Sequence, residues 1–169
     1  MTVAELDALP ESAARAALTA CCGAAPWVAA MLASRPWRER AALLAASERA
    51  WAALSPGQLA ESIERHPRLG EARAVAELDA RERRWSAAEQ SGAEAAADDA
   101  RAALARGNAE YERRFGHTFI LCASGRDAED MLAALRARLG NSREAELAIT
   151  ARELEKITTL RLEKLLAGV

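Results

Sequence analysis

The chain is poor in aromatic residues and carries little excess charge of either sign. Aromatic residues make up 4% of its 169 residues, and the formal net charge is -2. Acidic and basic residues are interspersed, so there is no basic stripe to follow a phosphate backbone and no polybasic patch for an anionic membrane. We therefore expect neither nucleic acid nor a membrane among its partners.

Long apolar runs and targeting signals are also missing. No apolar stretch approaches the roughly 20 residues that a membrane-spanning helix needs, and the N-terminal MTVAELDALPE is acidic where a signal peptide would be basic. The C-terminal Ala-Gly-Val is not a Ser-Lys-Leu-type peroxisomal address. Cys21, Cys22 and Cys122 show no C-x-x-C spacing, which favours reduced thiols. These features indicate a cytoplasmic protein.

Motifs for metals, nucleophilic serine or phosphate are absent. The only histidines are His66 and His117, and neither belongs to an H-E-x-x-H or similar pattern. There is no G-x-S-x-G and no glycine-rich phosphate loop. We therefore expect no metal site, and we expect His117 to be structural.

What the chain does contain is helix-forming residues. Hydrophobic residues account for 51% of the sequence and charged residues for 28%, and most of the apolar share is alanine, beside abundant Leu, Arg and Glu. The length fits one ordinary domain with a core of its own. The sequence predicts an all-α fold, a single-domain bundle over residues 1–169 with about eight helices of unequal length.

Caps, prolines and the spacing of leucines set the predicted helix boundaries. Thr2 with Glu5, and Ser55 with Gln58, have capping-box spacing. Helical segments are expected at about residues 2–9, 11–22, 26–34, 37–54, 56–65 and 71–84, from Ser86, and at 93–115, 127–139 and 141–167. Residues 117–123, HTFILCA, are the only stretch with strand-like composition. We expect an extended or partly helical buried segment there, followed by a turn at residues 124–126.

Four polar features interrupt this pattern, and each has a structural alternative. His66 lies between a helix end and a proline, where it can satisfy the last helix carbonyls or serve as an acid or base at a cleft. Glu89 can be only the carboxylate of a capping box with Ser86, whereas Gln90 has no such role. Arg161 can snorkel from a packed helix or pair with a nearby acid such as Glu163 or Glu155. Arg126, which follows the apolar HTFILCA, is the fourth feature.

Four motifs that include most of these features occur in order along the chain. They are His66-Pro67-Arg68-Leu69-Gly70, Ser86-x-x-Glu89-Gln90-x-Gly92, Asn108-x-x-Tyr111-x-x-x-Phe115-Gly116-x-x-Phe119-Ile120-x-Cys122-Ala123, and Glu153-x-x-Lys156-Ile157-x-x-Leu160-Arg161-Leu162. Taken in order, they resemble a known family, the 2-oxo-4-hydroxy-4-carboxy-5-ureidoimidazoline (OHCU) decarboxylases. The earlier segment with Trp27, Met31 and Arg35-Pro36 also follows that family. Each motif is weak alone, but four in order at the family's spacing are specific.

The resemblance implies an all-helical homodimer that acts on OHCU, a small molecule, without metal or organic cofactor. It would follow urate oxidase and hydroxyisourate hydrolase and release (S)-allantoin. By position, His66, Glu89 and Arg161 match catalytic residues of the family. Substrate contacts are implied for Pro67, Ser86, Ala87, Ala88, Glu89, Gln90, Phe119, Ile120, Leu121, Cys122, Ala123 and Ser124. Arg68 departs from the family, many of whose members have an acid there, which affects the expected substrate affinity more than the reaction type.

The implied chemistry suits these residue types. The substrate carries its carboxylate on a hydroxylated ring carbon next to a C=N carbon, so loss of carbon dioxide can push electrons into that imine. The protein must then hold one pose, deliver a proton to one face and stabilise negative charge. Two alternatives remain open: a helical interaction module without catalysis, and a related enzyme for another ureido substrate.

Overall fold

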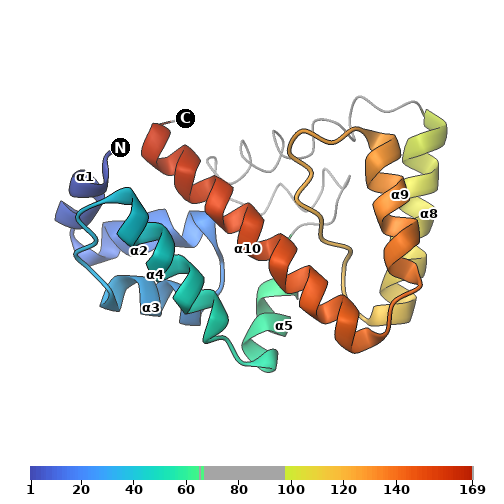
Figure 1. Cartoon of the computed structure of the whole chain (residues 1–169), viewed down its shortest axis with the longest axis horizontal. Coiled ribbons are helices and arrows are strands. Elements are labelled where there is room, and N and C mark those ends of the chain that lie inside the picture. Colours follow the sequence, from blue (N-terminus) through green and yellow to red (C-terminus); the bar gives the residue numbers. More distant parts are fainter. Residues whose placement is uncertain (65, 67–97, 169) are drawn as a thin grey trace. The chain divides into compact units, whose positions relative to one another are not determined.

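The structure is a computed structural model that describes residues 1–64, 66 and 98–168. Within them the chain forms eight helices and no strand, which confirms the predicted all-α fold (Figure 1). The predicted helices at 71–84 and from Ser86 lie outside the described residues, as does the start of the one expected at 93–115. The helices are α1 (Val3–Ala8), α2 (Glu11–Cys21), α3 (Ala25–Ala33), α4 (Arg40–Ala52), α5 (Pro56–Glu64), α8 (Asp98–Phe115), α9 (Ala128–Leu139) and α10 (Arg143–Ala167).

The chain forms two compact units, each described here by itself. Unit 1 comprises Met1–Arg65 and Glu155–Val169, and unit 2 comprises His66–Leu154. Helix α10 therefore contributes its first part to unit 2 and its second part to unit 1. No helix in the described residues is long and apolar enough to cross a membrane.

Two helices begin with the capping boxes that the sequence predicts. At α1, the Thr2 hydroxyl accepts the Glu5 N–H at 3.2 Å, and the Glu5 carboxylate accepts the Thr2 N–H at 2.7 Å. These two bonds lower the pKa of the Glu5 carboxyl. At α5, Ser55 and Gln58 exchange the same pair of bonds at 3.3 and 2.9 Å. Reciprocal capping satisfies N–H groups that a helix start leaves without partners.

Helix α4 starts three residues later than predicted, at Arg40 and not at Trp37. The Asp7 carboxylate accepts the backbone N–H groups of Trp37 and Arg38, at 3.0 and 2.8 Å. Arg38 has φ 68°, in the left-handed region. These long-range bonds hold the backbone out of the helix until Arg40.

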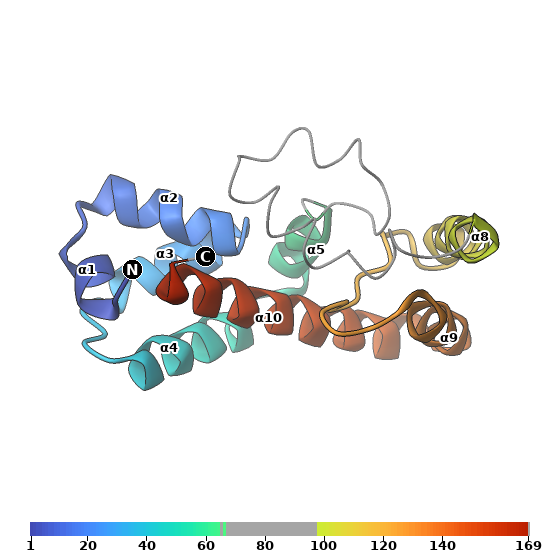
Figure 2. The ribbon, with the colours of Figure 1, turned by 90° about the horizontal axis from the view of Figure 1, so that it is seen from above.

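In unit 1, α2 packs on α3 and α3 packs on α4. The C-terminal half of α10 lies beside α4 (Figures 1 and 2), and Arg40 forms an ion pair there with Glu163. The guanidinium of Arg35 donates to the carbonyls of Leu6 and Leu9 at the end of α1, at 3.1 and 2.8 Å. Unit 1 is thus stabilised by apolar helix packing and by Arg35, which donates hydrogen bonds to backbone carbonyls at the end of α1.

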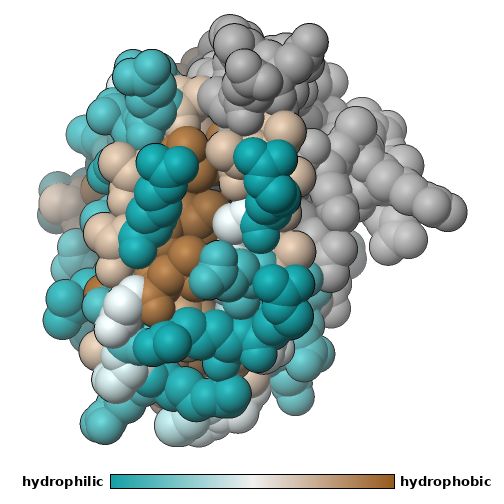
Figure 3. Space-filling view, turned by 90° about the vertical axis from the view of Figure 1, so that its right-hand side faces the viewer, coloured by the Kyte–Doolittle hydropathy of each residue, from teal (hydrophilic) through white to brown (hydrophobic). Residues whose placement is uncertain are grey.

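In unit 2, α8 and α9 lie side by side and run in the same direction, so residues 116–127 must return along them (Figure 1). A helix of the length of α9 is about 18 Å long, which about six extended residues can span. The helix pair and this returning segment share one hydrophobic cluster: Leu104, Tyr111, Phe115, Phe119, Leu121, Ala123, Ala128, Met131 and Leu135. The face in Figure 3 carries a hydrophobic band between rows of hydrophilic side chains.

Helices α8 and α9 approach closely at Gly107. A Cβ atom at this position would lie 2.3 Å from Cδ2 and 3.3 Å from Cγ of Leu135, whose side chain is fully buried in the cluster. Because Leu135 is enclosed on all sides, it has little freedom to move away. Gly107 is therefore a packing requirement of the helix pair.

Gly107→Ala should lower the thermal unfolding midpoint by several degrees, although alanine is the better helix former. The gain in helix propensity is about 1 kcal/mol, and overpacking in a full core costs about 1–3 kcal/mol. Gly57→Ala is the matched control, because Gly57 lies in α5 with open space around its would-be Cβ; it should leave the midpoint unchanged or raise it. Equal midpoints for the two variants would contradict the close approach.

Candidate active site

The predicted site residues fall into four groups in the structure. Six of them lie outside the described residues: Pro67, Ser86, Ala87, Ala88, Glu89 and Gln90. His66 is partly buried just after the end of α5. Residues Phe119 to Ser124 connect α8 to α9, and Arg161 lies on α10.

Arg161 is buried, with 6% of its surface exposed. A snorkelling arginine keeps its charged end in water, so the alternative that Arg161 snorkels to solvent is wrong. Its neighbour Glu163 pairs with Arg40. A buried guanidinium is costly unless it is well paired, and Arg161 does have a polar partner in the structure.

Helix α8 is followed by Gly116, which has a left-handed conformation. We call residues 118–123 the connecting segment. They form neither helix nor strand. Four of its side chains are buried, Cys122 is partly exposed, and Ser124 after it is exposed. The predicted turn follows, because Gly125 has φ 75° and the Arg126 N–H donates to the Ala123 carbonyl at 3.1 Å. The predicted burial is confirmed, and of the two predicted conformations the partly helical one is wrong, because residues 118–123 contain no helix. The buried side chains are Phe119, Ile120, Leu121 and Ala123.

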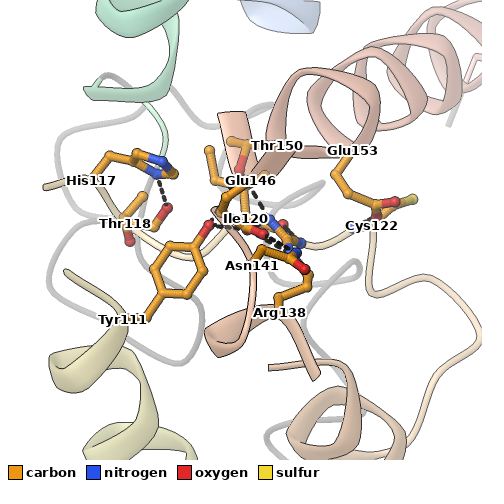
Figure 4. A network of polar contacts seen from close by, with 10 residues as sticks. All are labelled: Tyr111, His117, Thr118, Ile120, Cys122, Arg138, Asn141, Glu146, Thr150 and Glu153. Atoms are coloured by element: carbon orange, nitrogen blue, oxygen red, sulfur yellow. Dashed lines mark hydrogen bonds and ion pairs between the residues drawn. The ribbon is translucent and has the colours of Figure 1, made fainter. Parts of the chain in front are cut away.

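Side chains of α9 and α10 bind the backbone of the connecting segment (Figure 4). Arg138 Nη1 donates to the Ile120 carbonyl at 2.6 Å, and the Cys122 N–H donates to Glu153 Oε2 at 2.8 Å. Buried backbone groups need partners, and this segment has no helix or sheet to provide them. Two charged side chains therefore take the place of a neighbouring strand.

Arg138 belongs to a buried ion pair with Glu146, whose side chain is 0% exposed. Arg138 Nε and Nη2 lie 2.7 and 2.6 Å from the same carboxylate oxygen. Nη2 also donates to the Thr150 hydroxyl at 3.0 Å, and the Asn141 amide donates to the second oxygen of Glu146 at 2.7 Å. Such a pair is tolerable in a core only when hydrogen bonds satisfy its remaining polar atoms.

Tyr111 extends this network to α8. Its hydroxyl donates to Glu146, lies 3.3 Å from the Thr150 hydroxyl and accepts from Arg138 Nη2 at 3.2 Å. Its ring meets that of Phe119 edge to face, with centroids 5.1 Å apart. Burial, and then the bond to Glu146, raise the pKa of the Tyr111 hydroxyl above its ordinary value of 10.0. The buried phenol is therefore a neutral donor at any ordinary pH.

Because Tyr111 is the only tyrosine in the chain, its ionisation can be followed directly. Its pKa is raised in the folded state, so this group's stabilising contribution is complete below about pH 10 and is lost as the pH rises above that value. Tyrosinate absorbance of the folded protein should appear well above pH 10, and that of the denatured chain near pH 10. Tyr111→Phe should lack this component of the alkaline loss of stability. A folded-state midpoint near 10 would contradict the buried hydrogen bond.

The prediction from sequence included the connecting segment but not the residues that hold it. Glu153 and Tyr111 stood only within the motifs of the family resemblance, and Arg138 and Glu146 were not predicted to have any role. Glu146 also explains a small boundary error. Asn141 does not open α10; its side chain binds Glu146, whereas Ser142 accepts the Ala145 N–H at 3.2 Å.

The three cysteines are all described, and none of them forms a disulfide. Cys21 and Cys22 are buried and Cys122 is partly exposed. Of the two histidines, His117 has its Nδ1 atom 3.0 Å from the Thr118 carbonyl, where a protonated Nδ1 donates a hydrogen bond. Its ring lies against Tyr111, with centroids 5.5 Å apart. This position suits the structural role that the sequence predicts for His117.

The described residues define an all-helical protein in which side chains anchor a buried, extended connection across a parallel helix pair. Residues 7–163 match the family model for OHCU decarboxylase. The chain belongs to the OHCU decarboxylase family.

Two curated proteins are similar in sequence. The uric acid degradation bifunctional protein TTL of Arabidopsis thaliana is 35% identical over 146 residues, which covers 86% of this chain and 45% of that protein. The 2-oxo-4-hydroxy-4-carboxy-5-ureidoimidazoline decarboxylase of Amia calva is 38% identical over 65 residues, which covers 38% of this chain and 37% of that protein. The chain thus covers less than half the length of each of these relatives.

Two solved structures are similar in fold. A crystal structure of OHCU decarboxylase in the presence of (S)-allantoin shares 29% identity at a TM-score of 0.74, covering 88% of this chain and 96% of that one. A crystal structure of (S)-allantoin synthase aligns at a TM-score of 0.71 with 22% identity, covering 98% of this chain and 54% of that one. The second similarity concerns the fold alone.

Proposed function

We propose that this protein is a carboxy-lyase that converts OHCU to (S)-allantoin in urate degradation. The observation that carries the proposal is the family match over residues 7–163. The similar structure solved with (S)-allantoin supports it, because the alignment covers 96% of that enzyme. The same match favours one family domain over the whole of residues 1–169.

His66 is proposed as the group that moves the proton. Imidazole side chains exchange protons near neutral pH, and a residue between helices can be held at a cleft. Protonation of the intermediate from a single face would give a single enantiomer. The partly buried position of His66 at the end of α5 agrees with a group that is shielded from bulk water but still reachable.

Arg161 and the pair Glu89 and Gln90 are proposed to orient the substrate. A buried guanidinium can make charge-assisted, bidentate contacts to a carboxylate or carbonyl, and the burial of Arg161 supports this role. Glu89 and Gln90 suit the N–H and C=O groups of the ureido chain and ring. Pro67, Ser86 to Ala88 and the backbone of Phe119 to Ser124 are proposed to complete the binding site.

The reaction needs no electron sink beyond the substrate's own imine, so the proposal includes no metal and no organic cofactor. The protein's part is positioning, one proton and stabilisation of charge. A homodimer and a cytoplasmic location belong to the same proposal; the first rests on the family resemblance and the second on the sequence.

The activity is tested by circular dichroism during urate oxidation with urate oxidase and hydroxyisourate hydrolase, with and without this protein. The expected result is a faster (S)-allantoin signal that scales with protein concentration. An unchanged, slow and racemising course would reject the decarboxylase and favour a changed substrate or a binding role.

The catalytic assignments are tested with matched pairs of variants. His66→Asn should lower kcat by about 10²-fold or more, as loss of a general acid or base does, whereas His117→Asn should retain most of it. Arg161→Lys should lower kcat/KM by at least tenfold because a lysine cannot form the bidentate contact. Arg152→Lys, an exposed change on the same helix, should have no effect. Retained activity in His66→Asn would mean that another group moves the proton.

A further inference from the structure

The two bonds to the connecting segment are spaced two residues apart. Arg138 holds the carbonyl of Ile120, and Glu153 holds the N–H of Cys122. In an extended chain the polar groups of residues i and i+2 point to one side, and those of the residue between them point to the other. The side chains of α9 and α10 therefore bind one edge of the segment and leave the opposite edge free of these bonds.

The opposite edge belongs to Leu121. This residue is buried, yet among the described residues its backbone N–H and C=O have no hydrogen-bond partner. Buried backbone groups are nearly always paired with protein, water or a ligand. An N–H donor and a C=O acceptor side by side match a ureido or cyclic amide group, which presents the complementary pair.

Glu153 and Arg138 are both nearly fully buried, so the bonds to Ile120 and Cys122 are shielded from competing water. The guanidinium of Arg138 also covers the Phe119 ring, with its central carbon 4.6 Å from the ring centroid. The segment is thus held by its backbone at two points and by one aromatic side chain. Such support fixes the direction in which the intervening peptide groups point.

We propose that Glu153, together with Arg138, is a positioning residue for substrate binding. The two side chains hold one edge of residues Ile120 to Cys122. The Leu121 N–H and C=O on the other edge are thereby directed toward the ureido group or ring amide of the substrate. This inference rests on the proposed function, which gives the segment to the substrate. Neither side chain touches the substrate itself.

Glu153 is the better residue for a test. Arg138 also pairs with Glu146 in the core, so its loss would destabilise unit 2 whatever its effect on binding. Glu153→Gln keeps an oxygen that can accept the Cys122 N–H, whereas Glu153→Ala removes the acceptor. Glu153→Asp keeps the charge but withdraws the carboxylate by one methylene, and it provides a folded variant if the alanine protein does not fold.

The experiment measures kcat and KM with freshly generated OHCU for folded wild-type and variant proteins. Glu153→Ala should raise KM about tenfold with kcat within about threefold, because the lost contact acts on ground state and transition state alike. Glu153→Asp should raise KM severalfold, and Glu153→Gln should stay within about threefold of the wild type. Amide exchange at Cys122 should be faster in the alanine variant than in the glutamine variant.

Tyr111→Phe is the control for general loosening of the network. It removes the hydroxyl's bonds to Glu146, Thr150 and Arg138 but leaves both bonds to the segment backbone. It should lower the unfolding midpoint and leave KM unchanged. If the wild type is active, two results would overturn the positioning role but not the proposed function. One is an unchanged KM in both Glu153→Ala and Glu153→Asp. The other is a rise of KM in Tyr111→Phe as large as that in Glu153→Ala. A wild type without activity would reject the proposed function itself.

Discussion

The buried guanidinium of Arg138 is the interaction on which unit 2 depends. One cation on α9 binds Tyr111 of α8, the Ile120 carbonyl of the connecting segment, and Glu146 and Thr150 of α10. Moving a guanidinium and a carboxylate out of water costs free energy. The surrounding hydroxyl, amide and carbonyl groups offset that cost by forming hydrogen bonds with the N–H donors of Arg138 and the carboxylate oxygens of Glu146. The network therefore specifies one arrangement of the four elements, where apolar packing alone would tolerate several.

Local signals explain why most of the fold could be predicted from the sequence. The caps at Thr2 and Ser55, the position of Pro26 at the start of α3, and Gly116 at the end of α8 act within one helical turn. Strand-like composition also marked residues 117–123 correctly as a segment that interrupts the helices. The start of α4 was predicted wrongly because the deciding group, Asp7, is 30 residues away in sequence from Trp37.

The candidate site was predicted in a different way, and less completely. His66, Glu89, Arg161 and the connecting segment came from motif spacing shared with a family, and burial has since excluded the snorkelling alternative for Arg161. Of the residues that anchor the segment, Glu153 stood within such a motif, whereas Arg138 had no such signal. Arg138 and Glu146 lie on helices rich in charged residues, where a buried ion pair and a solvated one look the same until tertiary structure brings α8, α9 and α10 together.

The missing side chain at Gly107 has an effect that reaches beyond its own contact. Gly107 lies one turn before Tyr111 on α8, and the Leu135 that it accommodates lies one turn before Arg138 on α9. The distance between the two helices at Gly107 thus also sets how close the Tyr111 phenol and the Arg138 guanidinium lie one turn later. Through Arg138 it affects the position of the Ile120 carbonyl. The absence of one methyl group between two packed helices therefore helps to set the position of the peptide groups that the substrate is proposed to contact.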